Sequence, residues 1–497
     1  MITNDQNSRG KVGQHVALAG LAIYVATAPH SVAASVIGVA IAGVGWVIRT
    51  IRTGNFGLRR SKFDVVIVLS LVWTAISALL SEEPRISIAK LQASWCVFLF
   101  YLARATIGYV RHASACRNTR QAEACRTHAL ALTVLLIVSG SVGALYSGFD
   151  LLRGRGVVIE SIAANSPLQQ VEIQPGDTIW QINRRRVYST PDVDRLLAEA
   201  PLNSSVSVGI ISHGEQVERS FTITQPTASE VIGTERNHHF RASGWTRHYQ
   251  TFAELLQMIA LLALGLALAN LRNHGPNKYF RVAIVAAALL TAGLLFTAMR
   301  TVIVAFVIGA SVIALRSLRG KMKVVFTFAL FFVLAFGAVV VWQTRDRSAL
   351  LLGDSSSSLR MQIGRVGLSR ILIHPVFGHG MDAMQKHWTE WGFPGKDMLH
   401  LHSTPLQLAF DRGLPMLALW LWLMIAFWLF IARAERAAAD LSDTHSYGIL
   451  LGILGALTGF LASSLVNYNY GDAEVAMMFW FLMGISHRLH GLGTDNP

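Results

Sequence analysis

The stretch 446-SYGILLGILGALTGFLASSLVN-467 decides the fold class, because its 22 consecutive residues include no charged side chain. An apolar helix of that length crosses the hydrocarbon core of a bilayer, which is roughly 30 Å thick. The composition of the whole chain agrees with this interpretation. Of its 497 residues, 52% are hydrophobic and 14% are charged, whereas soluble proteins average about 25% charged residues. The sequence therefore predicts a membrane protein.

Outward from this stretch, the apolar residues gather into further blocks of similar length. Each block is long enough for one membrane-spanning helix, the structure that satisfies every backbone polar group within lipid. We predict an all-α polytopic membrane protein with about 12 transmembrane helices, the first two forming a helical hairpin around Pro29–His30. The predicted spans are 14–28, 31–48, 64–80, 91–110, 128–147, 249–270, 280–298, 301–315, 324–343, 413–432, 446–467 and 472–487.

Lysine and arginine set the predicted orientation. With a cytoplasmic N-terminus, the cytoplasmic connections and termini hold 21 of these residues and the short external connections hold three. Positive residues remain on the cytoplasmic side, so both termini are predicted to be cytoplasmic. The net charge of +14 then reflects topology, and we expect no nucleic-acid partner. Cys96 lies in a span and Cys116 and Cys125 in a cytoplasmic loop, so we expect no disulfide.

The topology divides the chain into five regions. Residues 1–147 form an N-terminal membrane part of about five helices, 249–343 the central helices and 413–497 the C-terminal helices. Two long segments, 148–248 and 344–412, are predicted to lie outside the membrane on the periplasmic side. Residues 148–248 read as a small α+β domain with linkers, because alternating strand patterns at 156–162, 178–182, 205–211 and 217–223 surround a short amphipathic helix at 191–200.

The stretch 155-RGVVIESIAANSPLQQVEIQPGDTIWQINRRRV-187 resembles a PDZ domain of the permuted bacterial kind found in periplasmic proteases. The matching pieces are the Arg-Gly-Val-Val start, Asn165-Ser166-Pro167, Gln174-Pro175-Gly176-Asp177 and Ile182-Asn183. The segment 168-LQQVEI-173 departs from the family pattern. The resemblance implies that Arg155, Gly156, Val157 and Val158 line a site for the C-terminal carboxylate of a partner protein. The alternative is a spacer domain without a ligand, and nothing in the domain resembles a protease nucleophile and its base.

The segment 344–412 is rich in cations and histidines. A cationic surface at the outer membrane face suits an anionic ligand such as a phosphate or diphosphate. Arg300 lies at a short external turn, where a charge is costly unless it is paired or functional. A single loop arginine or histidine is more often a solvated or structural residue. The cations and histidines of this segment are Arg360, Arg365, Arg370, Lys386 and Arg412, with His374, His379, His387, His400 and His402.

The His400–Leu401–His402 pair raises the possibility of zinc. Zinc sites require three or four ligands, and no cysteine or glutamate is spaced to complete this one. The sequence therefore predicts no metal and no cofactor.

Taken together, these features resemble the superfamily of O-antigen ligases and O-antigen polymerases. That superfamily has about twelve spans and a large periplasmic loop before the third span from the end. Its loop carries an arginine, then Pro-Φ-Φ-Gly-x-Gly, then His-Asn-x-x-Leu-Gln followed by an acidic residue and Gly-Leu. Here Arg360 precedes 375-PVFGHG-380 by fifteen residues, and the second element reads 402-HSTPLQLAFDRGL-414. Ser403 replaces the usual asparagine.

The resemblance implies an enzyme of the bacterial inner membrane that makes a surface polysaccharide such as lipopolysaccharide. It would transfer a glycan from a polyprenyl-diphosphate carrier to an acceptor hydroxyl on the periplasmic face, without a metal. Arg300 and Arg360 would stabilise the diphosphate leaving group, and His402 would act as the base. Arg365, His400 and Asp411 are the predicted substrate-binding residues. The acceptor, a lipid, a glycan or a protein, stays open, and so does the choice between ligase and polymerase.

Two alternatives remain at this stage. One is a protein O-oligosaccharyltransferase of the same superfamily, with the PDZ-like domain recruiting a protein acceptor. The other is a non-enzymatic envelope sensor or scaffold that binds protein C-termini through that domain. A transporter is less favoured, because the predicted spans hold few charges apart from Asp64 and Arg104.

Overall fold

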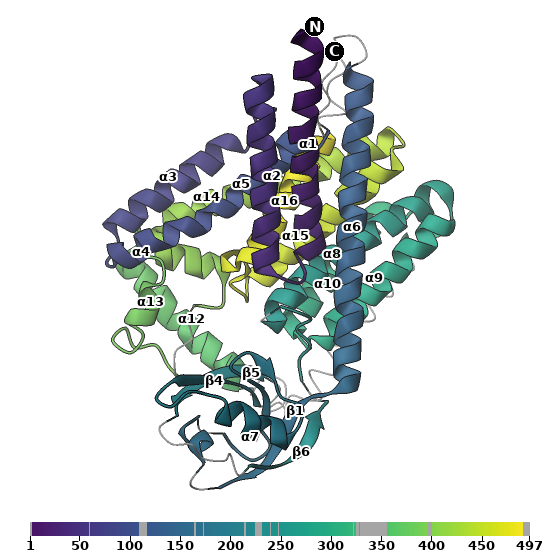
Figure 1. The fold of residues 1–497 in the computed structure, drawn as a ribbon. Coiled ribbons are helices and arrows are strands. Elements are labelled where there is room, and N and C mark those ends of the chain that lie inside the picture. The colour runs from purple at the N-terminus through teal and green to yellow at the C-terminus, as the bar shows by residue number, and fades with distance from the viewer. Residues whose placement is uncertain are drawn as a thin grey trace. The chain divides into compact units, whose positions relative to one another are not determined.

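The computed structural model describes residues 2–58, 60–108, 117–163, 166–171, 173–212, 215–223, 231–238, 240–246, 248–321, 323–324, 328, 355–395 and 400–490. The fold is mostly helical, with one small sheet (Figure 1). Two compact units divide the chain. The membrane unit comprises Met1–Gly140, Glu254–Thr291 and Arg300–Pro497, and the PDZ-like unit comprises Ser141–Ala253 and Ala292–Met299.

The helices follow the predicted apolar blocks, with some differences in length. In the N-terminal half they are α1 (Ile2–Thr27), α2 (Val32–Thr53), α3 (Asp64–Leu80), α4 (Pro84–Lys90), the 3₁₀ helix η1 (Leu91–Val97), α5 (Phe98–Thr106), α6 (Arg117–Arg153), η2 (Pro167–Val171) and α7 (Thr190–Ala198). In the C-terminal half they are α8 (Tyr249–His274), α9 (Lys278–Phe296), α10 (Arg300–Ser317), α12 (Ser355–Ile373), α13 (Ala383–Lys386), α14 (Thr404–Asp440), α15 (Thr444–Ser464), η4 (Asn469–Gly471) and α16 (Ala473–His490).

The predicted count of about twelve spans is not confirmed. Among the described residues, eight helical segments are long and apolar enough to cross a membrane, and α3 is a shorter apolar helix. The predicted span 91–110 is replaced by α4, η1 and α5 in succession, which together form one of the eight segments. The predicted span 324–343 lies outside the described residues apart from positions 324 and 328.

In the membrane unit, connections that were predicted to lie on the same side of the membrane contact one another. At one end, Arg126 forms an ion pair with Asp443, and the Arg488 guanidinium donates to the Ile107 carbonyl at 2.7 Å. These residues all lie in or beside connections that were predicted to be cytoplasmic. Residues of the predicted external connections meet one another elsewhere, as the contacts of Glu82 and Glu83 described below demonstrate. The grouping agrees with the predicted topology.

Two of the three cysteines lie among the described residues. Cys96 and Cys125 are buried free thiols, and the Cys125 Sγ lies 3.6 Å from the Arg488 carbonyl. Cys116 lies outside the described residues. Because Cys125 is buried, thiol labelling there would fail from either side of the membrane. Labelling of Cys125 therefore cannot test the orientation.

The PDZ-like unit contains the predicted strands and helix, and two strands that were not predicted. Its six-stranded sheet has the order β5-β4-β2-β1-β6, with β3 paired to β2. Alternating apolar residues from β1, β2 and β4 pack with Leu196 and Leu197 of α7 in one core. Asn165 of the sequence motif lies outside the described residues. The strands are β1 (Arg155–Ile162), β2 (Thr178–Ile182), β3 (Arg185–Arg186), β4 (Ser205–Ser212), β5 (Glu215–Thr222) and β6 (Val231–Asn237).

The start of α14 explains two glycines of the sequence pattern. Gly413 interrupts the helix with φ of 80°, so the chain turns between a first stretch from Thr404 and the longer apolar stretch beyond it. A Cβ at Gly413 would lie 1.8 Å from the Val376 carbonyl oxygen. A Cβ at Gly378, where φ is 71°, would lie 2.5 Å from the Asp411 carbonyl carbon. Only glycine fits both positions, so the Pro-Φ-Φ-Gly-x-Gly stretch and the Gly-Leu step form one packed unit.

Candidate functional site

The segment from α12 to the start of α14 folds over a core of its own. Ile363 and Ile371 of α12 pack with Trp388, Trp391 and Phe393 of the following loop, and with Phe410 of α14. Leu401, between the two histidines of interest, is buried in the same core with 2% exposure. The core therefore fixes the backbone at His400 and His402, although both belong to a loop.

His402 has an unusual backbone and an unusual environment. Its φ is 53°, in the left-handed region that few non-glycine residues adopt. Its ring centroid lies 4.7 Å from that of His400. Burial, followed by the electrostatic effects of His400 and Arg360, lowers the pKa of His402 to about 3. The imidazole is therefore neutral at physiological pH.

The structure places the three predicted arginines in different settings. Arg360, on α12, is close enough to act electrostatically on His402. Its Nε is buried and has no hydrogen-bond partner among the described residues. Arg300 is exposed at the first residue of α10. Arg365 is exposed, and its guanidinium lies 3.8 Å from Met361 Sδ on the same helix. Arg360 is thus the arginine that the fold brings to His402.

Asp411 acts on the histidine pair through an intermediary. It is buried with 3% exposure, and its Oδ1 accepts a hydrogen bond from Gln407 Nε2 at 2.8 Å. The other side of that amide, Gln407 Oε1, accepts from the Leu401 backbone N–H at 2.7 Å. Asp411 therefore orients Gln407, and Gln407 holds the residue between the two histidines. Ser403 stands at the N-cap position of α14, where serine is favoured.

A buried polar network connects the start of α10 to the start of α14. Asn467 donates from Nδ2 to Thr301 Oγ1 at 3.1 Å, and its carbonyl accepts from Thr404 N at 3.1 Å. Glu254 of α8, which is 1% exposed, accepts a short hydrogen bond from Ser463. Arg300 immediately precedes Thr301, and Thr404 follows His402 by two residues. The network therefore connects the residue after Arg300 and the helix start after His402 through one buried asparagine, Asn467.

A cavity of about 210 Å³ opens beside Asp411 in the membrane unit. Lys90 and Arg412 line it together with Tyr468 and Tyr470. Lys90 forms an ion pair with Asp382, and Arg412 Nε is buried without a partner among the described residues. Sequence reasoning did not select these lining residues, because Lys90 and the two tyrosines lie far from the 344–412 segment in the chain.

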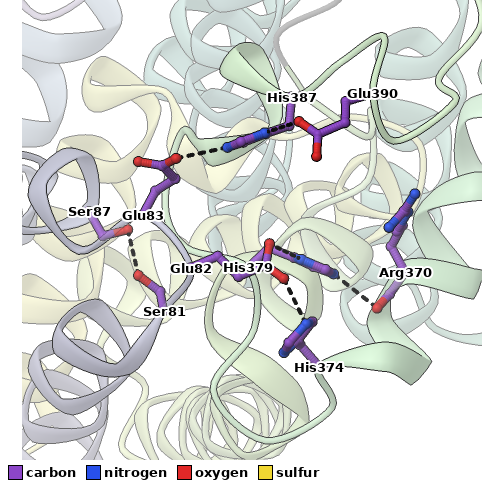
Figure 2. Close-up of polar contacts among 9 residues, drawn as sticks. All are labelled: Ser81, Glu82, Glu83, Ser87, Arg370, His374, His379, His387 and Glu390. Atoms are coloured by element: carbon purple, nitrogen blue, oxygen red, sulfur yellow. Dashed lines mark hydrogen bonds and ion pairs between the residues drawn. The ribbon is translucent and has the colours of Figure 1, made fainter.

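A second group of histidines lies against two acids of the α3–α4 turn (Figure 2). Glu82 contacts His374 and His379, and Glu83 contacts His387. Hydrogen bonds with Glu390 and Glu83 raise the pKa of His387 above its usual range. Glu82, His374 and His379 offer three ligand atoms within 4.8 Å of one another. This trio, rather than the His400–His402 pair, is the group among the described residues that could hold a metal ion.

The residues predicted to bind a peptide, Arg155 to Val158, contact other parts of the PDZ-like unit, and their role in peptide binding stays a prediction. β1 pairs with β2 along one edge and with β6 along the other, so Val157 and Val158 have no free edge for an added strand. Arg155 is buried and donates from Nε to Asp150 Oδ2 at 2.6 Å. A Cβ at Gly156 would lie 2.3 Å from the Ile179 carbonyl oxygen. The strand at this end of the sheet is β6, and α7 packs beside it.

The fold and the site define a multi-pass membrane protein that carries a PDZ-like domain and a folded extramembrane segment with a neutral histidine beside an arginine. Comparisons with known families agree with both parts. A family model described as O-antigen ligase matches residues 285–421, a range that includes Arg300, Arg360, His402 and Asp411. A model described as PDZ domain matches residues 158–211. Both resemblances predicted from the sequence are confirmed, and the first supports glycan transfer of the ligase or polymerase type.

One curated relative is similar over a short part of its length. The magnetosome formation protease MamE of Magnetospirillum gryphiswaldense is 31% identical over 78 residues, which are 16% of this chain and 10% of that protein. The chain thus spans about a tenth of this relative. A match of 78 residues has the length of one small domain, so the similarity carries no inference about proteolysis.

Proposed function

We propose that this protein transfers a glycan from a polyprenyl-diphosphate carrier to an acceptor hydroxyl on the periplasmic face of the bacterial inner membrane. The observation that carries this proposal is the electrostatic effect of Arg360 on His402. Arg360 Nε is buried without a hydrogen-bond partner among the described residues, and Arg360 contributes to the low pKa of His402, within the segment that matches the O-antigen ligase family.

The proposed reaction needs an anion-stabilising group and a proton acceptor. The acceptor oxygen attacks the anomeric carbon, and the bond from that carbon to the diphosphate oxygen breaks with its electron pair. Negative charge grows on the leaving diphosphate, where Arg360 and Arg300 stabilise it. The proton of the attacking hydroxyl passes to His402. Atoms and charge balance without any further reactant.

The low pKa of His402 fits this scheme through the charge of the donor. A base with a pKa of about 3 binds protons weakly at neutral pH, and the Arg360 cation contributes to that weakness. A bound diphosphate neutralises the arginine field and adds negative charge, so it raises the basicity of His402. The histidine would thus become an effective base when the donor is bound. Asp411, through Gln407, keeps the histidine pair in place.

The proposal is tested by glycan transfer with the purified full-length chain and a polyprenyl-diphosphate-linked glycan. We expect His402→Ala, Arg360→Ala and Arg300→Ala to lose transfer while retaining the thermal melting profile of the wild type. Arg433→Ala is the matched control, because Arg433 is exposed and lies on the predicted cytoplasmic side. Normal transfer by all three site variants would refute the proposal.

A second proposal concerns the PDZ-like unit. We infer that it takes an extended peptide from a protein partner along β6, beside α7, in place of the predicted site at Arg155–Val158. This position is favoured because β6 is the edge strand at one end of the sheet and α7 packs beside it. Backbone hydrogen bonds to a sheet edge are a common mode of peptide recognition. Ile232→Pro restricts the backbone of β6 and should abolish peptide binding, whereas Ile232→Thr should retain it.

A further inference from the structure

We propose that Glu82, His374 and His379 form a binding site for one divalent transition-metal ion of the zinc class, separate from the glycan-transfer site. Two imidazoles and one carboxylate are a donor set that such ions favour. The three residues come from the α3–α4 turn and from the segment after α12 (Figure 2). This inference does not depend on the proposed transferase activity.

The geometry suits a small cation with little adjustment. Glu82 Oε1 lies 2.7 Å from His374 Nε2, and Glu82 Oε2 lies 3.0 Å from His379 Nδ1. Three ligand atoms within 4.8 Å of one another can surround an ion at bond lengths of about 2.0–2.2 Å. Three protein ligands leave a fourth position for water, as in many zinc sites.

The ring of His379 has an oxygen atom facing each of its two nitrogens. Its Nε2 lies 3.0 Å from the Arg370 carbonyl oxygen, which can only accept, so Nε2 must carry a hydrogen. The other ring nitrogen, Nδ1, faces the Glu82 carboxylate. In a neutral imidazole Nδ1 would carry a lone pair directed at that carboxylate, so a proton or a metal ion must stand between them. A backbone carbonyl that holds the second nitrogen is the usual support of a metal-binding histidine.

The surroundings of His379 hold its ring rigidly while leaving a route for an ion. The side chain is 1% exposed and stacks on Phe410 with ring centroids 4.6 Å apart. Its backbone N–H donates to the Phe410 carbonyl at 2.8 Å. Glu82 and His374, by contrast, have side chains that are 36% and 41% exposed. An ion can therefore reach the site from solvent and find one ligand already oriented.

A bound ion would join two segments that are 297 residues apart in the chain. It would hold the α3–α4 turn against the 374–380 loop. The Gly380 N–H donates to the Asp411 carbonyl at 3.0 Å, so the loop is connected directly to the residue that orients Gln407. The ion would thus stabilise the extramembrane segment without taking part in glycan transfer.

The test measures metal binding directly. The full-length chain, purified without a polyhistidine tag and stripped with a chelator, is titrated with Zn²⁺ by calorimetry, and bound zinc is counted by mass spectrometry. We expect one Zn²⁺ per chain, and a loss of affinity of about tenfold or more in Glu82→Gln, His379→Gln and His374→Gln. Since the His374 side chain is 41% exposed and that of His379 is buried, the His374 variant keeps the measurement interpretable if His379→Gln fails to fold.

The matched control is Glu83→Gln, which alters the neighbouring acid and its contact with His387 but leaves the three proposed ligands intact. It should bind zinc as the wild type does. Zn²⁺ should also raise the melting temperature of the wild type and of Glu83→Gln, but not that of the ligand variants. The absence of stoichiometric zinc, or equal affinity in all variants, would mean that protons alone occupy this position and would overturn the proposal.

Discussion

Two histidine clusters in the same extramembrane segment differ in the sign of the charges around them. His374, His379 and His387 lie against the carboxylates of Glu82, Glu83 and Glu390. His402 instead responds to the positive charges of His400 and Arg360. The first arrangement favours a positively charged imidazole or a bound cation, and the second favours a neutral imidazole that awaits an anion. This difference fits the two proposals, in which the acid-paired cluster stabilises the segment and the arginine-paired cluster takes part in glycan transfer.

The largest expected effect is a difference in the rate of glycan transfer between two variants, each with one histidine of one cluster substituted. His402→Gln should reduce glycan transfer by about 100-fold or more, the usual contribution of a general base. His387→Gln should leave transfer within about twofold, because His387 is not among the residues proposed to contact donor or acceptor. Initial rates with saturating donor provide the measurement. Comparable losses in both variants would show that the clusters do not differ in function.

The next effect concerns the arginines. Arg360→Ala should lower transfer by about 10²–10³-fold, as expected for loss of one charge-stabilising donor. Arg360→Lys should recover part of that rate, because lysine retains the charge but not the planar guanidinium. Arg365→Ala should have a smaller effect than Arg360→Ala, since Arg365 is exposed. The comparison uses kcat/KM for the same donor, and a reversed order would place the diphosphate nearer to Arg365.

A smaller effect is expected at Asp411, which acts through Gln407. Asp411→Leu removes the acceptor of the Gln407 hydrogen bond and should lower kcat by about tenfold, within the range expected when a positioning contact is lost. Asp411→Asn retains an acceptor oxygen and should approach the wild-type rate. Thermal melting of both variants controls for misfolding. If Asp411→Asn lost as much activity as Asp411→Leu, the negative charge itself would be required.

The smallest effect is a dependence of stability on pH. An unfolded histidine has a pKa of about 6.5, whereas folded His402 has a pKa of about 3. Between these values the unfolded state binds a proton that the folded state does not, so His402 lowers stability as the pH falls through this range. The melting temperature of His402→Gln should therefore decrease less than that of the wild type between about pH 7 and pH 4. Parallel decreases would mean that His402 titrates normally in the folded protein.

Part of the site could be predicted because it depends on residues close together in the sequence. Arg360, the Pro-Φ-Φ-Gly-x-Gly stretch and His402 lie within 43 positions of one another, and their order and spacing were enough to select them. Lys90 and Glu82 could not be selected in this way. Each comes from a different helix or turn, and no local pattern indicates that it meets the 355–412 segment.

The same difference between local patterns and distant contacts applies to the sheet of the PDZ-like unit. Its strands were predicted from alternation of apolar residues, which depends on neighbouring positions. The pairing of β6 with β1 was not predicted, because the paired residues lie 69 to 82 positions apart in the chain. Strand alternation indicates which residues face the core, but it does not indicate which strands pair.

The sequence by itself determined that this is a polytopic membrane protein with a PDZ-like insertion and an arginine–histidine segment like that of O-antigen ligases. Apolar length, strand alternation and motif spacing are local properties, and each is readable along the chain. Only the tertiary structure decided that Arg360 acts on His402, that β6 lies at the end of the sheet, and that Glu82 meets His374 and His379. These are contacts between distant segments, and they depend on how helices and loops pack together.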